Sequence, residues 1–302
     1  MYQLEDIKNK IYNQGRDLEV ALFNHYFLED DREMVSYALS IYQNEDGGFG
    51  HGLEPDNTNP DSSSFQTSYA LELLVNIGYK STTLDEFTKD MVDSAVQFLK
   101  TQLTDDLWLA TIPSNNEASC AIWWKHQQGV NSFLENPTVS IVGTLLQLLD
   151  ETDDFYQTLV KLQTKYYHHF LSTKVEDKHL LACYIHFYQG LKVTNQFDLE
   201  PFYKKLSNEI KESIDGVDLW NEGYVTTPFS YPLYEETYGI EVKLIQQNLD
   251  FLEKTYVHNH WNINFTWMNE DEGFDVQAIK WQAIITIHNL RLIKKYQEAV
   301  VF

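Results

Sequence analysis

The feature that most constrains the fold is an alternation between two kinds of helical segment. The first kind carries its apolar residues on one stripe and comprises 31–43, 90–102, 202–214 and 242–256. The second kind is apolar almost all round and comprises 67–78, 139–150, 179–190 and 283–293. A helix without a polar face must be covered on every side. We therefore expect two concentric layers, with the buried helices inside and the amphipathic ones over them.

Further helices are indicated at 3–13 and 17–28, which brings the expected total to about eleven or twelve. Strand-like alternation is nearly absent, so the chain is predicted to be all-α. Three long connections, 46–63, 103–136 and 215–240, carry aromatic residues and prolines rather than the Gly/Ser composition of a flexible linker. We therefore expect one domain over residues 1–302.

Composition excludes several classes of partner. The apolar fraction of 43% is ample for a large core, and 17 Phe, 19 Tyr and 7 Trp fill that core or line a cavity. The formal net charge of −23 repels nucleic acid and anionic membrane surfaces. No signal peptide and no membrane-spanning run is visible, and Cys120 and Cys183 are too few for a disulfide framework. We expect a cytoplasmic protein that does not insert into membranes.

A glycine-rich turn follows the first amphipathic segment, in the string QNEDGGFG at 43–50. Asp46 is suited to accept hydrogen bonds from nearby backbone N–H groups, and the glycine pair permits a tight reversal. Phe49 is expected to pack beneath the Gln43 amide. These residues are predicted to serve the fold rather than catalysis.

Parts of this pattern recur along the chain. Gln43, Gln102 and Gln163 are about 60 residues apart, the spacing of a helix-pair unit, and each is expected near the end of an outer helix. An acidic residue followed by an aromatic one comes after the first two, as Asp46 to Phe49 and Asp106 to Trp108. Weaker echoes are Asp218–Trp220 and His260–Trp261. The sequence thus indicates a degenerate internal repeat.

Residues 43–78 resemble the repeat of the terpenoid cyclase and protein prenyltransferase superfamily. In that repeat an outer helix ends in Gln, an Asp-Gly-Gly-aromatic-Gly turn follows, and a Ser/Thr-Ala-rich inner helix begins after a loop. The inner-helix part is matched by Thr67, Ala70, Leu71 and Leu74. The resemblance implies an (α/α)6 toroid whose functional residues lie where the inner helices begin, at one mouth.

The loop that leads from the turn into the 65–77 helix carries the candidate catalytic carboxylates. These are Glu54, Asp56 and Asp61, with His51 as a candidate substrate-binding residue. A helix N-terminus attracts capping residues, and Asp61 or Ser64 fits that simpler role. Glu54 and Asp56 lie too far upstream to cap the helix and are the stronger functional candidates.

Aromatic residues in the other long connections are expected at the same mouth. Trp123 and Trp124 precede an inner helix at 136–138, Tyr224 precedes one near 231, and Trp267 and Trp281 flank the start of the last. Rings beside carboxylates suit a small apolar ligand, such as a polyene whose cations need π faces, or a sugar. They equally suit an ordinary loop core.

The sequence departs from the family at its catalytic motifs. The nearest match to the Asp-x-Asp-Asp motif of class II cyclases is the string ETDD at 151–154, after an inner helix, where a solvated turn is expected. The Asp, Cys and His zinc ligands of protein prenyltransferases have no counterpart, and acidic mouth loops disfavour a diphosphate. We expect no cofactor. His179, Cys183 and His186 share a helix face and form the only metal alternative.

Three functions remain open from the sequence. The first is an enzyme of the cyclase type, in which Glu54 or Asp56 is kept protonated by an apolar pocket and acts as general acid. The second is a carbohydrate-active enzyme that pairs Asp56 with Glu222 or Glu272. The third is a module that binds a small molecule or a protein without catalysis.

Overall fold

The computed structural model describes residues 2–29, 31–269 and 273–297. Over these residues the chain forms eleven α-helices and four short 3₁₀-helices, with isolated bridges but no β-strand. The prediction of an all-α protein is confirmed. No helix within these ranges combines the length and apolar character needed to cross a bilayer.

The helices keep the order expected from the sequence. The α-helices are α1 (Leu4–Gln14), α2 (Asp17–Phe27), α3 (Arg32–Ser40), α4 (Ser64–Asn76), α5 (Glu86–Gln102), α6 (Thr138–Leu148), α7 (Tyr156–Ser172), α8 (Lys178–Thr194), α9 (Leu199–Ser213), α10 (Val242–Thr255) and α11 (Phe274–Tyr296). The 3₁₀-helices are η1 (Pro113–Asn116), η2 (Ile122–Trp124), η3 (Val217–Leu219) and η4 (Pro228–Ser230).

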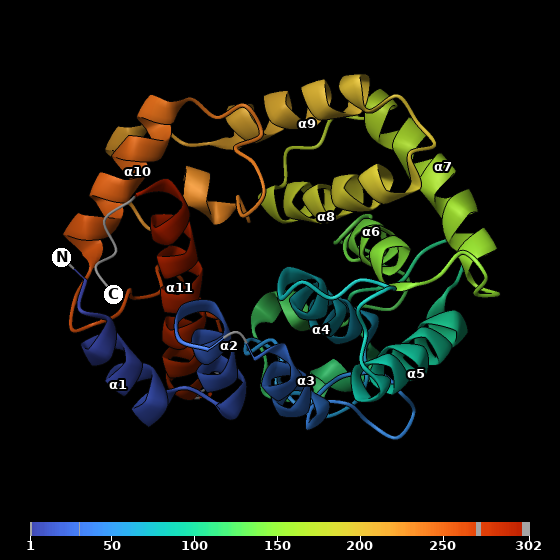
Figure 1. The fold of residues 1–302 in the computed structure, drawn as a ribbon, viewed down its shortest axis with the longest axis horizontal. Helices are drawn as coiled ribbons and strands as arrows, with labels where there is room; N and C mark the ends of the chain where they lie inside the picture. Colours follow the sequence, from blue (N-terminus) through green and yellow to red (C-terminus); the bar gives the residue numbers. More distant parts are fainter. Residues whose placement is uncertain (1, 30, 270–272, 298–302) are drawn as a thin grey trace.

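The two kinds of helix differ in burial as the sequence predicts. Ten of the eleven residues of α6 are buried, whereas α5 and α9 bury only one face. Figure 1 shows α1, α3, α5, α7, α9 and α10 along the perimeter of the molecule and α4, α6 and α8 inside it. The apolar helices are thus the ones that have helices around them.

The inside helices α6 and α8 meet backbone to backbone at two glycines. A β-carbon added to Gly143 would lie 2.3 Å from the carbonyl oxygen of His186, and one added to Gly190 would lie 2.5 Å from the carbonyl oxygen of Gly143. Only a residue without a side chain allows this approach. The two helices are therefore held in a single register.

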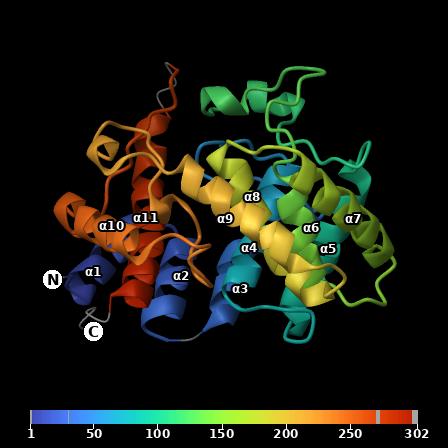
Figure 2. The same cartoon turned by 90° about the horizontal axis from the view of Figure 1, so that it is seen from above.

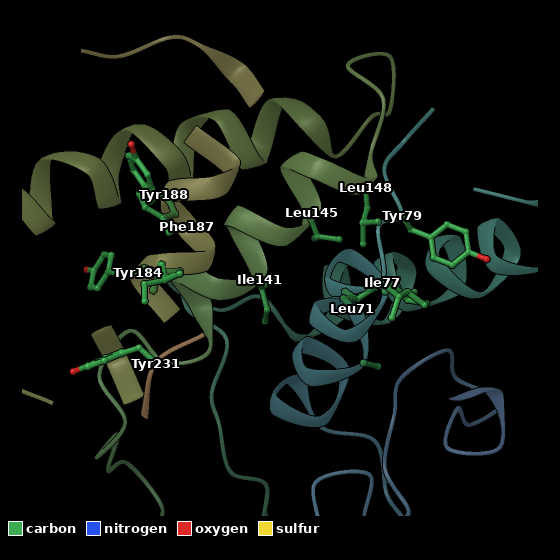
Figure 3. Packing of buried hydrophobic residues seen from close by; sticks show 14 of the residues in the cluster. Leu71, Ile77, Tyr79, Ile141, Leu145, Leu148, Tyr184, Phe187, Tyr188 and Tyr231 are labelled. Carbon is green, nitrogen blue, oxygen red and sulfur yellow. The ribbon is translucent and has the colours of Figure 1, made fainter. Parts of the chain in front are cut away.

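The core extends to both sides of α6. In Figure 3, Ile141 and Leu145 of α6 lie between Leu71 of α4 and the α8 residues Tyr184 and Phe187. The same cluster continues around the molecule to α11, which packs against α1, α2 and α10. Figure 2 shows the 103–136 connection on the side of the molecule toward which the N-terminal end of α11 points.

The prediction of an inner helix near residue 231 is wrong. After η4 the chain runs without a helix from Tyr231 to Glu241. Pro232 has no backbone N–H to donate and disfavours helical geometry at the residue before it. Tyr238 and Gly239 then take positive φ values of 48° and 72°, which interrupt a right-handed helix. Irregular chain thus occupies this part of the fold.

Two other expectations about helix ends need correction. Gln163 lies in the middle of α7 rather than near its end, and its Nε2 donates to Thr194 Oγ1 at 2.5 Å. The helix predicted at 31–43 ends at Ser40, so that Gln43 lies in the turn that follows. The three glutamines therefore hold different positions: Gln43 follows α3, Gln102 is the last residue of α5, and Gln163 lies within α7.

The turn at 43–50 is held as predicted. Asp46 Oδ1 accepts hydrogen bonds from Gly48 N at 2.9 Å and from Ser62 Oγ at 2.7 Å. Gln43 Nε2 donates to the carbonyl oxygens of Gly47 and Met91, both at 2.9 Å, and so ties the turn to α5. The turn residues are used by the fold.

An indole hydrogen bond repeats with the same spacing in two distant units. Trp108 Nε1 donates to the carbonyl oxygen of Leu99, nine residues earlier, at 2.7 Å. Trp261 Nε1 donates to the carbonyl oxygen of Leu252, also nine residues earlier, at 2.8 Å. The accepting carbonyls belong to the last turns of α5 and α10, and that of Leu252 also accepts from Tyr256 N at 3.0 Å. The echo at Trp220 differs, because its indole reaches back only five residues.

A second bond links each of these aromatic residues forward to the following helix. The backbone N–H donates to a threonine hydroxyl in the pairs Phe49–Thr67 (3.0 Å), Trp108–Thr138 (2.9 Å) and Trp261–Thr286 (3.4 Å). We call this arrangement the aromatic joint. It gives the degenerate repeat in the sequence a common structural form.

The aromatic joint predicts a specific loss of stability. Thr138→Val removes the hydroxyl that accepts the buried Trp108 N–H and keeps the side-chain shape, so the free energy of unfolding should fall by about 1–3 kcal/mol. Thr138→Ser keeps the hydroxyl and should lose only about 0.8 kcal/mol for the missing methyl group. Urea unfolding measures both. A valine variant no less stable than the serine variant would show that the bond does not matter.

Candidate functional site

The loop that carries Glu54 and Asp56 is buried although it has no regular structure. Gln66, in the first turn of α4, accepts from Glu54 N at 2.7 Å through Oε1 and donates to the carbonyl oxygen of Asn57 at 3.3 Å. Arg16 Nη1 donates to the carbonyl oxygens of Gly52 and Leu53 at 2.8 and 3.0 Å. Because buried backbone groups need partners, these two side chains allow the loop to lie inside.

The Arg16 side chain is itself fixed by a buried ion pair. Its Nη2 lies 2.7 Å from Glu19 Oε1, and the side chains of Arg16 and Glu19 are 13% and 1% exposed. The Glu19 carboxylate therefore balances the positive charge of the guanidinium that contacts the loop. A buried pair of this kind is costly unless further hydrogen bonds satisfy it, as the Gly52 and Leu53 carbonyls do here.

Asp56 is clamped by two indoles from the C-terminal part of the chain. Trp267 Nε1 and Trp281 Nε1 both donate to Asp56 Oδ1, at 2.6 and 2.8 Å. Asp56 is 3% exposed and Trp267 is 1% exposed. Burial raises the pKa of Asp56, and the two indole bonds act in the opposite direction. Among the described residues no donor is recorded for Oδ2.

Glu54 is the more strongly perturbed acid. Burial, and then the neighbouring charge of Asp56, raise its pKa well above the ordinary value of 4.5. Asp56 N, which donates to Glu54 Oε2 at 3.1 Å, acts against this shift, as do Arg16 and the nearby Trp124 indole. Trp124 Nε1 is buried and makes no hydrogen bond of ordinary geometry. Burial and the Asp56 charge thus favour the protonated form of Glu54 in the folded protein.

Aromatic rings gather beside this acid pair around Phe265. Its ring centroid lies 6.2 Å from Trp123, 5.8 Å from Tyr224 and 6.0 Å from Trp281, each in an edge-on arrangement. Trp281 is also a donor to Asp56, so the rings and the carboxyl groups form one site. Phe265 was not among the predicted site residues, although it lies two residues before Trp267 in the same connection.

Tyr224 forms the exposed edge of these rings. It is 55% exposed, and its hydroxyl is 2.8 Å from His179 Nε2. Lys178 Nζ lies 3.5 Å from the centre of the ring. Partial burial, and then the charges of Asp177, Asp56 and Glu54, raise the pKa of Tyr224 to about 12.

The predicted site residues fall into two groups. Glu54, Asp56, Trp124, Trp267 and Trp281 meet in the interior, and Trp123 and Tyr224 join them through Phe265.

His51 and Asp61 form the other group and are exposed. His51 Nε2 lies 2.7 Å from Asn44 Oδ1, and Asp61 N donates to Asn59 Oδ1 at 3.1 Å. The N-cap of α4 is Ser63, whose side chain accepts from Gln66 N, and neither Asp61 nor Ser64 takes that role.

The metal alternative finds no support. Among the described residues no group of three or more His, Cys, Asp and Glu is placed to hold a metal ion. His179 is bonded to Tyr224, and His186 Nε2 lies 3.6 Å from Glu72 Oε2 on α4. Cys183 packs against the core, where burial raises its pKa. The two histidines of this α8 face therefore have different partners.

The ETDD string at 151–154 and Glu222, a candidate partner of Asp56, both lie at the surface. The 151–154 string forms the solvated turn between α6 and α7 that was expected, and Asp154 pairs with Lys100 at 2.6 Å. Glu222 is exposed and no contact with Asp56 is recorded. Glu272 lies outside the described residues.

Surface hollows lie away from the acid pair. One of about 480 Å³ lies beside Lys174 and Glu212 on α9, and a small one of about 10 Å³ lies between α1 and α11. Neither includes Glu54 or Asp56. Glu54 itself is only 7% exposed.

Searches against protein-family models, curated proteins and solved structures found no match to the chain. The family resemblance therefore rests on residues 43–78 alone, and it stays a prediction.

The raised pKa of Glu54 predicts how stability depends on pH. The native state holds the proton more tightly than the unfolded chain, so the free energy of unfolding should fall as pH rises from 4.5 into the neutral range. Each unit of raised pKa contributes about 1.4 kcal/mol to this fall. Glu54→Gln should flatten the slope and Glu222→Gln, at an exposed position, should not. Urea unfolding at a series of pH values measures it, and an unchanged slope in Glu54→Gln would contradict the assignment.

Proposed function

We propose that this chain is an acid-catalysing enzyme of the terpenoid cyclase and protein prenyltransferase type, acting on a small apolar molecule that contains a carbon–carbon double bond. One observation carries the proposal. Glu54 is a buried carboxyl group with a raised pKa, and it lies beside an aspartate whose orientation is set by two tryptophans. Acids that stay protonated at neutral pH are the groups that general acid catalysis requires.

The fold proposed for this function is a toroid of paired helices, in which the irregular chain at 228–241 replaces one inner helix. It is supported by the aromatic joint, since Trp108 and Trp261 each bond to an outer helix and to the inner one after it, and Phe49 bonds to the inner helix α4. The contacts of α11 with α1 and α2 support closure of the ring.

The reaction proposed begins with proton transfer from Glu54. The O–H bond of the carboxyl group breaks, and the π electrons of the alkene form a new C–H bond at one carbon. A carboxylate and a carbocation result. The faces of Trp281, Phe265 and Trp123 stabilise the cation. Loss of a proton to water neutralises the product, either directly from the cation or from the oxonium ion that forms when water adds to it, and solvent returns a proton to Glu54.

This mechanism predicts deuterium transfer. In D₂O the protein should place deuterium on carbon in a linear polyene, with squalene and farnesol as probes. Glu54→Gln and Asp56→Asn should reduce incorporation by about 10²-fold or more, whereas Glu222→Gln should not. Mass spectrometry of the products measures this, and circular dichroism checks that the variants are folded. Undiminished incorporation by Glu54→Gln would refute the role of Glu54.

A non-catalytic binding module is the second candidate, and the enclosure of the acid pair favours it. Asp56 is 3% exposed, and the hollows described above do not reach it. Under this alternative the wild-type protein transfers no deuterium to either probe, yet native mass spectrometry finds a small molecule retained by it and lost from a Trp281→Ala variant.

A further inference from the structure

An exposed apolar stripe runs along α3 on the side away from the core. Met34, Tyr37 and Ile41 follow one another at helical spacing, with 54%, 54% and 63% of their surfaces exposed. Phe87 of α5 extends the stripe, since its ring stacks on Tyr37 with centroids 4.6 Å apart and an angle of 26° between the planes. We call these four residues the α3 stripe.

The residues of the α3 stripe are not part of the hydrophobic core. α3 already buries Val35, Ser36 and Leu39 on its inner side. Single exposed apolar residues are ordinary on a protein surface, but a continuous row that includes a stacked aromatic pair marks a contact site. The helix is thus apolar on two sides, and one side has no partner in the chain as described.

Acidic residues frame the α3 stripe. The exposed members near it are Asp31, Glu33, Glu45, Glu86 and Asp90. Two nearby cations are already engaged. Arg32 lies 4.5 Å from the ring centre of Tyr79 and donates to the carbonyl oxygen of Thr83, and Lys89 pairs with Asp93 at 2.5 Å. The surface around the stripe is therefore negative.

We propose that the α3 stripe docks a basic amphipathic helix of a partner protein. The apolar face of that helix would cover Tyr37 and Phe87, and its Lys and Arg residues would face the acidic frame. From Met34 to Ile41 the stripe spans about two helical turns, or ~10 Å, which matches the i, i+3, i+7 anchors of helix recognition.

The negative charge around the α3 stripe favours a basic partner over a second copy of this chain or an anionic membrane. A second copy of this chain would bring its own net charge of −23 and an acidic frame of its own. An anionic bilayer would be repelled in the same way. A basic helix gains from both the apolar contact and the charges, and electrostatic steering speeds its association. This proposal uses no residue of the acid site and does not depend on the proposed function.

The experiment measures binding of synthetic peptides of about five helical turns. One peptide has Leu on one face and Lys on the other, a second has Leu and Glu, and a third has Ser and Lys. The Leu/Lys peptide should bind the wild-type protein most tightly and weaken as salt is raised. Tyr37→Ser and Phe87→Ser should each weaken its binding by about tenfold or more, whereas Val242→Ser, at a site 82% exposed on α10, should not.

Hydrogen exchange locates the contact, with protection expected at 31–43 and 85–94. Equal binding of the Leu/Glu or Ser/Lys peptide, or equal weakening by Val242→Ser, would overturn the proposal. So would a dimer of the protein alone that Tyr37→Ser dissociates, or binding to anionic vesicles that the same variant abolishes. The changed side chains lie outside the core, so the variants should fold normally. Circular dichroism checks that they do.

Discussion

The fold depends on how two of the outer helices, α5 and α10, are tied to the helix that follows each of them. At Trp108 and Trp261 one residue makes both ties, with its indole on a carbonyl of the preceding helix and its backbone N–H on a threonine of the next. Hydrophobic burial alone is non-directional and would let paired helices slide. The joint supplies direction, because hydrogen bonds in a dry interior are costly to break. It thereby determines where each connection leaves the core.

The loop that carries Glu54 and Asp56 is likewise held by hydrogen bonds in the interior. Glu54 and Asp56 are two residues apart and both are buried, yet they differ in what surrounds them. Asp56 receives two indole N–H groups, which favour its charged form, whereas Glu54 has the Asp56 charge as a neighbour. Acid–base sites commonly contain two titratable groups whose surroundings shift their pKa values apart. Gln66 and Arg16 hold the loop inside so that this difference persists.

Periodicity predicted what is buried but not which groups meet there. The helices apolar all round and the turn at 43–50 could be read from local patterns, as could the candidacy of Glu54 and Asp56. The missing helix near 231 followed from Pro232 and from two positive φ values, and only the proline is visible in the sequence. Phe265 had no local signal, since its role arises from rings contributed by three separate connections. Contacts between distant segments leave no period in a single sequence.

The indole clamp on Asp56 also bears on when the site forms. The two donors lie 211 and 225 residues after the aspartate, so closing these contacts belongs to the slow, non-local part of folding. Helix pairs such as α3 with α5 can assemble from nearby chain first. Asp56 therefore lacks its two indole donors until the C-terminal part of the chain has packed against the loop. The electrostatic surroundings of this carboxyl group are complete only in the finished tertiary structure.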